Sequence, residues 1–315
     1  ETGMNEAVKN PLTGFLTTGN LEFEPYYPNE TRAGSIMTKN ITWECDPSDE
    51  VAESYFNSSY IHAGLSGLEE TFKGLDAAKL LSDFSINNVY KWKIGTCKHL
   101  VALTPEGLVA NHALFMRDAE DSFRTTAGCS VPYLTGLQSQ KYQVEYTTRK
   151  TFIFQFSGSL SLTILEKATQ TDLHDLKFLH FRPVTIPGID TQLEVCRIGM
   201  SGTLAYEIHG YDEFGPAVYD VIYSIGKAMG MKRMGWKNYT ISHTFGGFPQ
   251  MTVNFELALY QDPGFRANAP FPMVCSGSAD PEDMRARFRS VVECDWAWMA
   301  KFDHEFVGRK ALEEE

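Results

Sequence analysis

Long apolar segments are missing from this sequence. No run of 18 or more apolar residues occurs, which excludes a hydrophobic transmembrane helix. The N-terminus also lacks the basic, apolar and small-residue order of a secretory signal peptide. The chain is therefore expected to act in the cytoplasm and to bind no membrane.

Positive charge is scarce. Lys and Arg number 28 against 40 Asp and Glu, which gives a net charge of −12. So acidic a chain is a poor general binder of nucleic acid or anionic lipid, although a local basic pocket for a small anion is compatible with it. The 315 residues are enough for about two domains.

Paired cysteines and the common catalytic signatures are also absent. The six cysteines, at 45, 97, 129, 196, 275 and 294, form no CxxC pair and no zinc-finger spacing with histidine. Free thiols in a reducing compartment are expected. The sequence contains no GxGxxG, GxxxxGK[ST], GxSxG or HExxH motif, so no nucleotide site, serine nucleophile or metal site is predicted.

The periodic segments that are present alternate between helix and strand patterns. Apolar residues at helical spacing predict helices over 74–81, 160–168 and 211–229. Alternating runs predict a strand over 151–156 and two hairpins, one from 98–103 and 108–115, the other from 192–198 and 203–209. This order predicts an α+β fold of mainly antiparallel sheets with packed helices.

The second hairpin carries the most informative chemistry. A strand from Cys196 leads through a turn with Gly199 and Gly202 to a returning strand at Glu207. On that strand Glu207 points to the opposite side from Tyr206 and Ile208. A carboxylate facing a pocket can bind an amidine-like N–H edge with two oxygens, whereas on an edge strand it would face solvent. Strand spacing alone leaves both alternatives open.

The hairpin also carries a family resemblance. Its pattern RxGxxGxxxYEI resembles the folate-binding aminomethyltransferases, the glycine-cleavage T-protein superfamily. The segments "GLDAAKLLSD", "CKHLVALTPEGLVANHALF", "FQFSGSLSLTILEKA", "DLKFLHF" and "AKFDHEFVGRKAL" match in the same order. Within the superfamily the chain is most similar to tetrahydrofolate-dependent O-demethylases of lignin-derived aromatics, the vanillate and syringate type. The resemblance runs from about residue 55 to the end.

The resemblance implies a fold and a domain division. The family fold is a cloverleaf of α+β domains around a folate channel, closed by a C-terminal β-barrel. The chain ends where that barrel would begin, so a cloverleaf lacking the barrel is expected. The implied division is a discontinuous folate-binding domain, 1–54 with 146–315, and an inserted α+β domain, 55–145.

The resemblance also implies tetrahydrofolate as cofactor and a set of site residues. Those assigned to the cofactor are Glu207, Tyr206, Asn111 and Phe248. Those assigned to catalysis are Tyr239, His112 and His62, and those assigned to the substrate are Arg124 and Tyr26. From the residues alone, His62, His112 and His209 are each more typical of a hydrogen-bonded structural residue, and Tyr239 of a packed aromatic.

Four departures from the family pattern bear on substrate and catalysis. His112 falls where the family has an acid, and Thr203 replaces a glutamate of the aminomethyltransferase motif. The demethylases carry His and Gln near 63–66, where this chain has Ala63, Gly64, Leu65 and Ser66. Arg124 lies two residues from Thr126, near which the demethylases have an arginine suited to a substrate carboxylate.

The expected activity is transfer of a methyl group from an aromatic methyl ether to folate N5. The Tyr239 phenol would donate a proton to the leaving oxygen. One alternative is an N- or S-demethylase or aminomethyltransferase, and another is a folate-binding paralogue without catalysis. The expected partner is a small methoxylated aromatic, with no nucleic acid and no membrane, and the expected state is a monomer or homodimer.

Overall fold

The chain folds into two compact units. The computed structural model describes residues 32–36, 39–63, 68–125, 130–199, 204–251, 253–268, 278–280 and 282–315. Of the described residues, the first unit comprises those within 69–148 and 249–315, and the second comprises those within 32–68 and 149–248. Contacts thus group 249–315 with 69–148, whereas the family resemblance assigns 249–315 to the domain of 1–54. The division implied by the resemblance stays a prediction.

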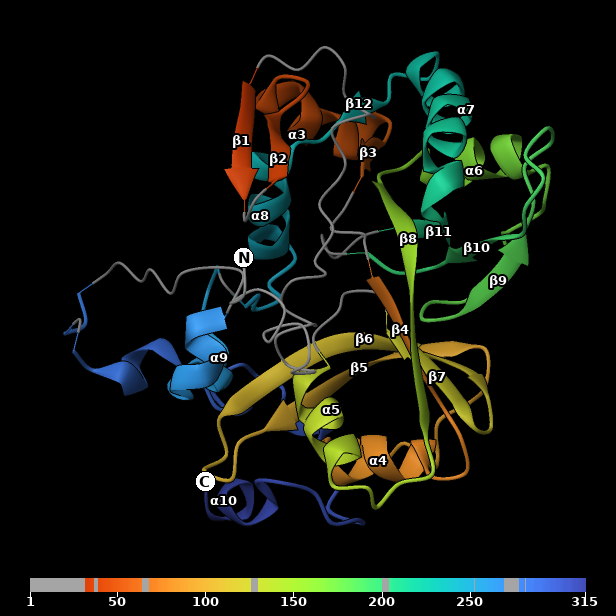
Figure 1. Ribbon diagram of the computed structural model, residues 1–315. Helices are drawn as coiled ribbons and strands as arrows, with labels where there is room; N and C mark the ends of the chain where they lie inside the picture. Colours follow the sequence, from red (N-terminus) through yellow and green to blue (C-terminus); the bar gives the residue numbers. More distant parts are fainter. Residues whose placement is uncertain are drawn as a thin grey trace, which may run out of the picture. The chain divides into compact units, whose positions relative to one another are not determined.

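The first unit is built on an antiparallel sheet in the order β5-β6-β7-β4 (Figure 1). The elements of this unit are β4 (Leu68–Lys73), α4 (Ala77–Asp83), β5 (Thr96–Leu103), β6 (Val109–Ala119), β7 (Ser122–Thr125), α5 (Val131–Gln138), α9 (Pro263–Asn268) and α10 (Arg309–Glu314). Short 3₁₀ helices lie at Ala258–Gln261, Met284–Arg287 and Ala297–Met299.

The hairpin and the helix predicted in this region are confirmed. β5 and β6 pair from Thr96↔Arg117 to Leu103↔Val109, and Gly107 supplies the turn with φ +86°. α4 buries its apolar stripe, including Leu80 and Leu81, against a core that also contains phenylalanines of β4, β6 and β7. The helices α4 and α5 therefore pack on one face of this sheet.

The second unit is built on a sheet in the order β3-β8-β11-β10-β9, all antiparallel, with β12 parallel to β3. The elements of this unit are β1 (Arg32–Ile36), β2 (Lys39–Glu44), α3 (Ser48–Asn57), β3 (Tyr60–His62), β8 (Glu145–Ser157), α6 (Ser161–Thr169), β9 (Phe181–Val184), β10 (Leu193–Cys196), β11 (Ala205–Tyr211), α7 (Gly215–Lys227), β12 (Lys232–Arg233) and α8 (Trp236–Phe245). The first four residues of β8 belong to the first unit.

Strict alternation along β8 and β11 gives this sheet two different faces. Phe152, Phe154 and Phe156 lie in one core with Tyr206 and Ile208. The helices α6 and α7 lie beside this sheet (Figure 1), and the buried apolar residues of both helices belong to the same core. Because successive strand residues point to opposite faces, Gln155, Glu207 and His209 lie on the other face.

The predicted α+β class with mainly antiparallel sheets is confirmed, and so are the predicted helices, strand and hairpin of the second unit. The described cysteines, Cys45, Cys97, Cys196 and Cys294, are buried as thiols. In the described part of the chain, no helix combines the length and apolarity needed to cross a bilayer.

Candidate functional site

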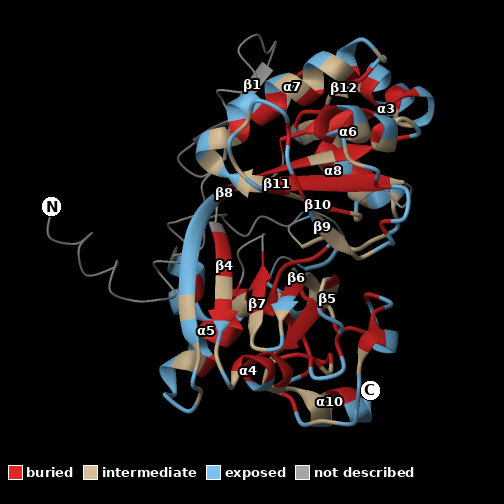
Figure 2. Ribbon diagram, turned by 90° about the vertical axis from the view of Figure 1, so that its right-hand side faces the viewer, coloured by how far each residue is buried: buried red, intermediate tan, exposed pale blue. Residues whose placement is uncertain are grey.

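A polar row crosses the sheet of the second unit on the face opposite its core. His62 on β3 lies opposite Gln155 on β8, and Gln155 lies opposite Glu207 on β11. Directly opposed residues project from the same face, so three polar side chains stand side by side. His209 follows two residues after Glu207 and shares this face. β11 is buried along most of its length (Figure 2), and in the row His62, Glu207 and His209 are buried while Gln155 is half-buried.

Glu207 is the centre of the row. Gln155 Nε2 donates to Glu207 Oε1 at 2.8 Å, and His209 Nε2 donates to Glu207 Oε2 at 2.9 Å. The Glu207 side chain is only 9% exposed, and in the described part of the chain no Lys or Arg lies within ion-pair distance of it. A buried carboxylate that lacks a Lys or Arg partner is stabilised by hydrogen-bond donors. Each of its oxygens retains capacity for a further donor.

The free atoms of the row are all hydrogen-bond acceptors. Three buried atoms have no partner in the described structure: Gln155 Oε1, His209 Nδ1 and His62 Nε2. Since His209 Nε2 donates to a carboxylate, a neutral His209 ring accepts at Nδ1. Since His62 Nδ1 donates to the Met234 carbonyl at 2.9 Å, a neutral His62 ring accepts at Nε2. The row therefore suits a ligand that presents several N–H or O–H donors.

Tyr239 lies beside this row on α8. Its ring centroid is 4.6 Å from that of His62 and 5.2 Å from that of His243, one helical turn further on. The pKa of His62 is lowered to about 4, mainly by burial and also by the nearby His243, although the hydrogen bond to the Met234 carbonyl acts to raise it. Burial also lowers the pKa of His243 to about 4. At neutral pH both imidazoles are uncharged, and the structure places the predicted residues His62 and Tyr239 together.

His112 and Asn111 lie in the first unit, on β6. His112 Nδ1 is 2.8 Å from His99 Nε2, and the His112 ring lies 4.9 Å from the Trp296 ring. Burial lowers the pKa of His99 to about 4. Asn111 is buried and, as the neighbour of His112 on a strand, points to the opposite face. The structure thus pairs His112 with a histidine that the sequence analysis does not single out.

Arg124, the predicted substrate residue, is engaged by two acids of its own unit. Its Nη1 donates to Glu69 Oε2 at 3.0 Å, and its Nε donates to both oxygens of Asp118 at 2.9 Å. Arg124 and Glu69 are buried. Two carboxylates against one guanidinium leave no surplus positive charge here for a substrate carboxylate.

The remaining predicted residues are scattered. Tyr206 is packed in the core on the face opposite Glu207, so we leave it out of the proposed site. Phe248 is half-buried just beyond α8, and its backbone N–H donates to the His243 carbonyl at 3.3 Å. Tyr26 lies outside the described residues, as do the departures at 64–66, Thr126 and Thr203.

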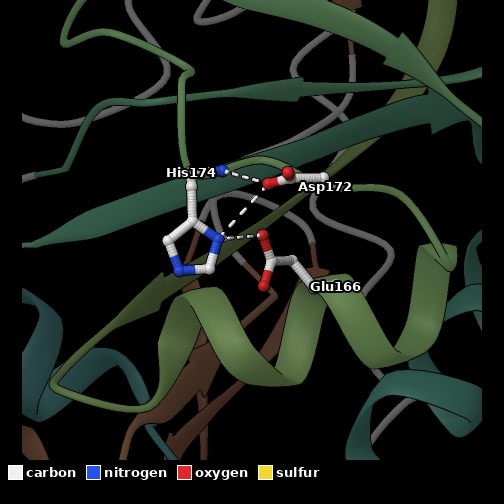
Figure 3. Close-up of side chains that lie close together, drawn as sticks. All are labelled: Glu166, Asp172 and His174. Atoms are coloured by element: carbon white, nitrogen blue, oxygen red, sulfur yellow. Dashed lines mark hydrogen bonds and ion pairs between the residues drawn. The ribbon is translucent and has the colours of Figure 1, made fainter.

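A second polar cluster lies at the surface of the second unit. Glu166, Asp172 and His174 each offer one possible ligand atom, all within 4.8 Å of one another. In Figure 3 the His174 ring faces Glu166, and its Nδ1 is 2.8 Å from Glu166 Oε1. This hydrogen bond raises the pKa of His174. With Asp172 and His174 exposed, the cluster is explained as an ion-paired turn.

Comparison with known proteins shows the family and the fold of the chain. A family model, described as the GCVT N-terminal domain, matches residues 65–250, more than half of the chain. The chain belongs to the GCVT family. Members of this family bind tetrahydrofolate. The fold is similar to that of glycine cleavage system aminomethyltransferase T from Bartonella henselae, with a TM-score of 0.64 at 15% identity over 93% of this chain and 73% of the other.

Two relatives of the chain have names that refer to aromatic compounds. The chain is 30% identical over 271 residues to sesamin methylene transferase of Sinomonas sp., covering 82% of this chain and 59% of the relative. It is 26% identical over 276 residues to syringate O-demethylase of Sphingobium sp., covering 82% and 58%. The chain therefore spans less than two thirds of the length of these relatives.

Gln155 and His243 are not predicted from the sequence as site residues, and His209 is predicted to be structural. A signal for Gln155 exists, because it is the one amide in the alternating run "TFIFQFS" and lies on the strand face opposite to the phenylalanines. Its partnership with Glu207 depends on the β8–β11 register, which a single sequence does not specify. His243 follows Tyr239 by four residues on α8, the spacing at which helical side chains meet.

Proposed function

We propose that the protein is a tetrahydrofolate-dependent O-demethylase that takes a methyl group from an aromatic methyl ether. The observation that carries the proposal is the row of buried acceptors centred on Glu207. Family membership supports the cofactor, and the two relatives named for aromatic compounds support the substrate class.

The polar row of His62, Gln155, Glu207 and His209, called the acceptor row below, fits the donor-rich edge of a reduced pterin. That edge presents an amino group and ring N–H groups, and all of them are donors. Glu207 would take the amidine-like part with its two oxygens, and Gln155 Oε1 and His209 Nδ1 offer further acceptors beside it. A buried polar atom left without a partner costs about 1–3 kcal/mol, so satisfying these atoms favours binding.

Tyr239 and His62 supply the groups for the chemical step. When bound, tetrahydrofolate supplies N5 as the acceptor of the methyl group. An aryl ether is a poor methyl donor because phenolate leaves slowly, and Tyr239 would donate its phenolic proton to the ether oxygen as the carbon–oxygen bond breaks. General acid catalysis of this kind contributes about 10²–10⁴-fold. His62, neutral with an acceptor at Nε2, would hold a substrate hydroxyl rather than donate a proton.

A turnover assay tests the proposal. The protein is incubated with tetrahydrofolate and a panel of methoxylated aromatics, and 5-methyltetrahydrofolate and the demethylated phenol are quantified together. We expect the two products in equal amounts with at least one member of the panel. Tight folate binding without product from any methoxy-aromatic would contradict the proposal and favour a folate-binding paralogue without catalysis.

A further inference from the structure

The carboxylate of Glu207 receives a hydrogen bond on each of its oxygens, from two different directions. Gln155 Nε2 donates to Oε1 at 2.8 Å from the neighbouring strand β8, and His209 Nε2 donates to Oε2 at 2.9 Å from β11 itself. The last torsion of a glutamate side chain has only broad preferences, so a carboxylate without such bonds can rotate. The two bonds together fix its plane.

Both donors stand on well-supported strands of the second unit. β8 and β11 are interior strands of the sheet, each paired on both sides. Gln155 lies directly opposite Glu207, where the side chains of paired strands are neighbours. Phe154 and Phe156, on either side of Gln155, are buried in the core. Backbone pairing and core packing therefore set where the two donors lie.

The two hydrogen bonds also bear on the charge of Glu207. Hydrogen bonds to an ionised carboxylate are roughly twice as strong as those between neutral groups. Glu207 and His209 are buried, so little water competes for their bond. A buried charge is tolerated where hydrogen bonds compensate for the hydration that it loses. Gln155 and His209 thus favour the ionised form of Glu207 as well as its orientation.

We infer that Gln155 and His209 are positioning residues, which keep Glu207 ionised and oriented for a ligand that carries N–H donors. A ligand then meets a carboxylate whose orientation is already fixed, so less conformational freedom is lost on binding. The inference rests on the proposed function and adds to it a role that both residues perform through Glu207.

A double-mutant cycle tests whether Gln155 acts through Glu207. Calorimetry measures tetrahydrofolate affinity in the wild type, Gln155→Met, Glu207→Gln and the variant with both changes. Met has nearly the length of Gln and removes the amide donor. We expect Gln155→Met to weaken binding about tenfold in the wild type but less than about threefold in Glu207→Gln, where the charged acceptor is gone. Losses that simply multiply in the double variant would overturn the inference.

Gln192→Met is the matched control for Gln155→Met. Gln192 is an exposed glutamine of the same unit, and its substitution makes the same chemical change. It should leave tetrahydrofolate affinity unchanged in both backgrounds. Equal losses in Gln192→Met and Gln155→Met would show that the amide opposite Glu207 has no special role.

His209 is tested by two substitutions that differ in whether a donor is retained. His209→Met removes the N–H group, whereas His209→Gln keeps one at a similar distance from the backbone. We expect His209→Met to bind tetrahydrofolate about tenfold more weakly and His209→Gln to recover most of that loss. Equal weakening in the two variants would assign His209 to packing and overturn its role as a positioning residue.

A measurement without ligand distinguishes failure of this inference from failure of the proposed function. The infrared difference between proteins with and without Glu207→Gln at pH 7 isolates the stretching band of the Glu207 carboxyl group. We expect an ionised carboxylate in the wild type, and partial protonation once Gln155→Met and His209→Met are combined. If the wild type binds no tetrahydrofolate, the proposed function is rejected and this band alone decides the inference. An ionised band that is unchanged in the combined variant would overturn it.

Discussion

The four residues of the acceptor row differ in how far the sequence predicts them. Strand alternation predicts that Glu207 and Tyr206 point to opposite faces of the sheet, and the structure confirms this. The prediction succeeds because the alternation is a local property of the backbone. Which nitrogen of His62 accepts a hydrogen bond cannot be predicted in this way. It is set by the Met234 carbonyl, 172 residues away in sequence, so only the tertiary structure reveals it.

Tyr239 is expected to act in the chemical step. Tyr239→Phe keeps the ring and its contacts with His62 and His243 and removes only the hydroxyl. If that hydroxyl protonates the leaving oxygen, kcat should fall by about 10²-fold or more, while tetrahydrofolate affinity stays nearly unchanged. Single-turnover kinetics on the best methoxy-aromatic measure the first, and calorimetry measures the second.

Tyr55→Phe is the matched control for Tyr239. Tyr55 is half-buried on α3 against the same small cluster of buried residues, so its loss of a hydroxyl probes packing in that region. It should retain turnover. Full turnover in Tyr239→Phe, or equal losses in both variants, would remove Tyr239 from the role of acid.

Among the elements, helices and hairpins are predictable while their contacts are not. The stripe of α4 and the β5–β6 hairpin follow from periodicity and a Pro-Glu-Gly turn, both local in sequence. Nothing in the sequence indicates that α5 crosses α4 so closely that a glycine is needed. A Cβ at Gly136 would lie 2.5 Å from a Phe84 ring carbon and 2.7 Å from Leu80 Cδ1.

Gly136→Ala therefore sets two effects against each other. Helix propensity favours alanine by about 0.5–1 kcal/mol. Overpacking at a close helix contact typically costs about 1–3 kcal/mol, so packing should win. We expect the free energy of unfolding to decrease by about 1 kcal/mol, measured by urea denaturation. An increase in stability would show that α4 and α5 can separate without cost.

For the whole molecule, composition predicts the class of protein but not where its buried histidines lie. His62, His99 and His243 all have pKa values lowered to about 4 by burial, against 6.5 when unfolded. Between these values the unfolded chain binds protons that the folded chain does not. Their contribution to stability is therefore complete above pH 6.5 and is lost as the pH falls towards 4.

This linkage predicts a steep loss of stability in weak acid. Each such histidine adds up to about 1.4 kcal/mol per pH unit to the slope of the unfolding free energy. In urea denaturation at pH 7, 6 and 5, His243→Gln should reduce the slope by about one proton. His174→Gln is the control, because the pKa of His174 is raised and its contribution has the opposite sign. An unchanged slope in His243→Gln would refute the assignment.

The central claim is that Glu207 and its row bind tetrahydrofolate, and calorimetry of Glu207→Gln tests it most directly. The substitution keeps the shape of the side chain but removes the charge and one acceptor, so donors of the pterin lose their partner. We predict that tetrahydrofolate binds on the order of tenfold more weakly or worse, while Asp220→Asn, an exposed acid on α7, binds like the wild type. Equal affinity in the wild type and Glu207→Gln would contradict the account.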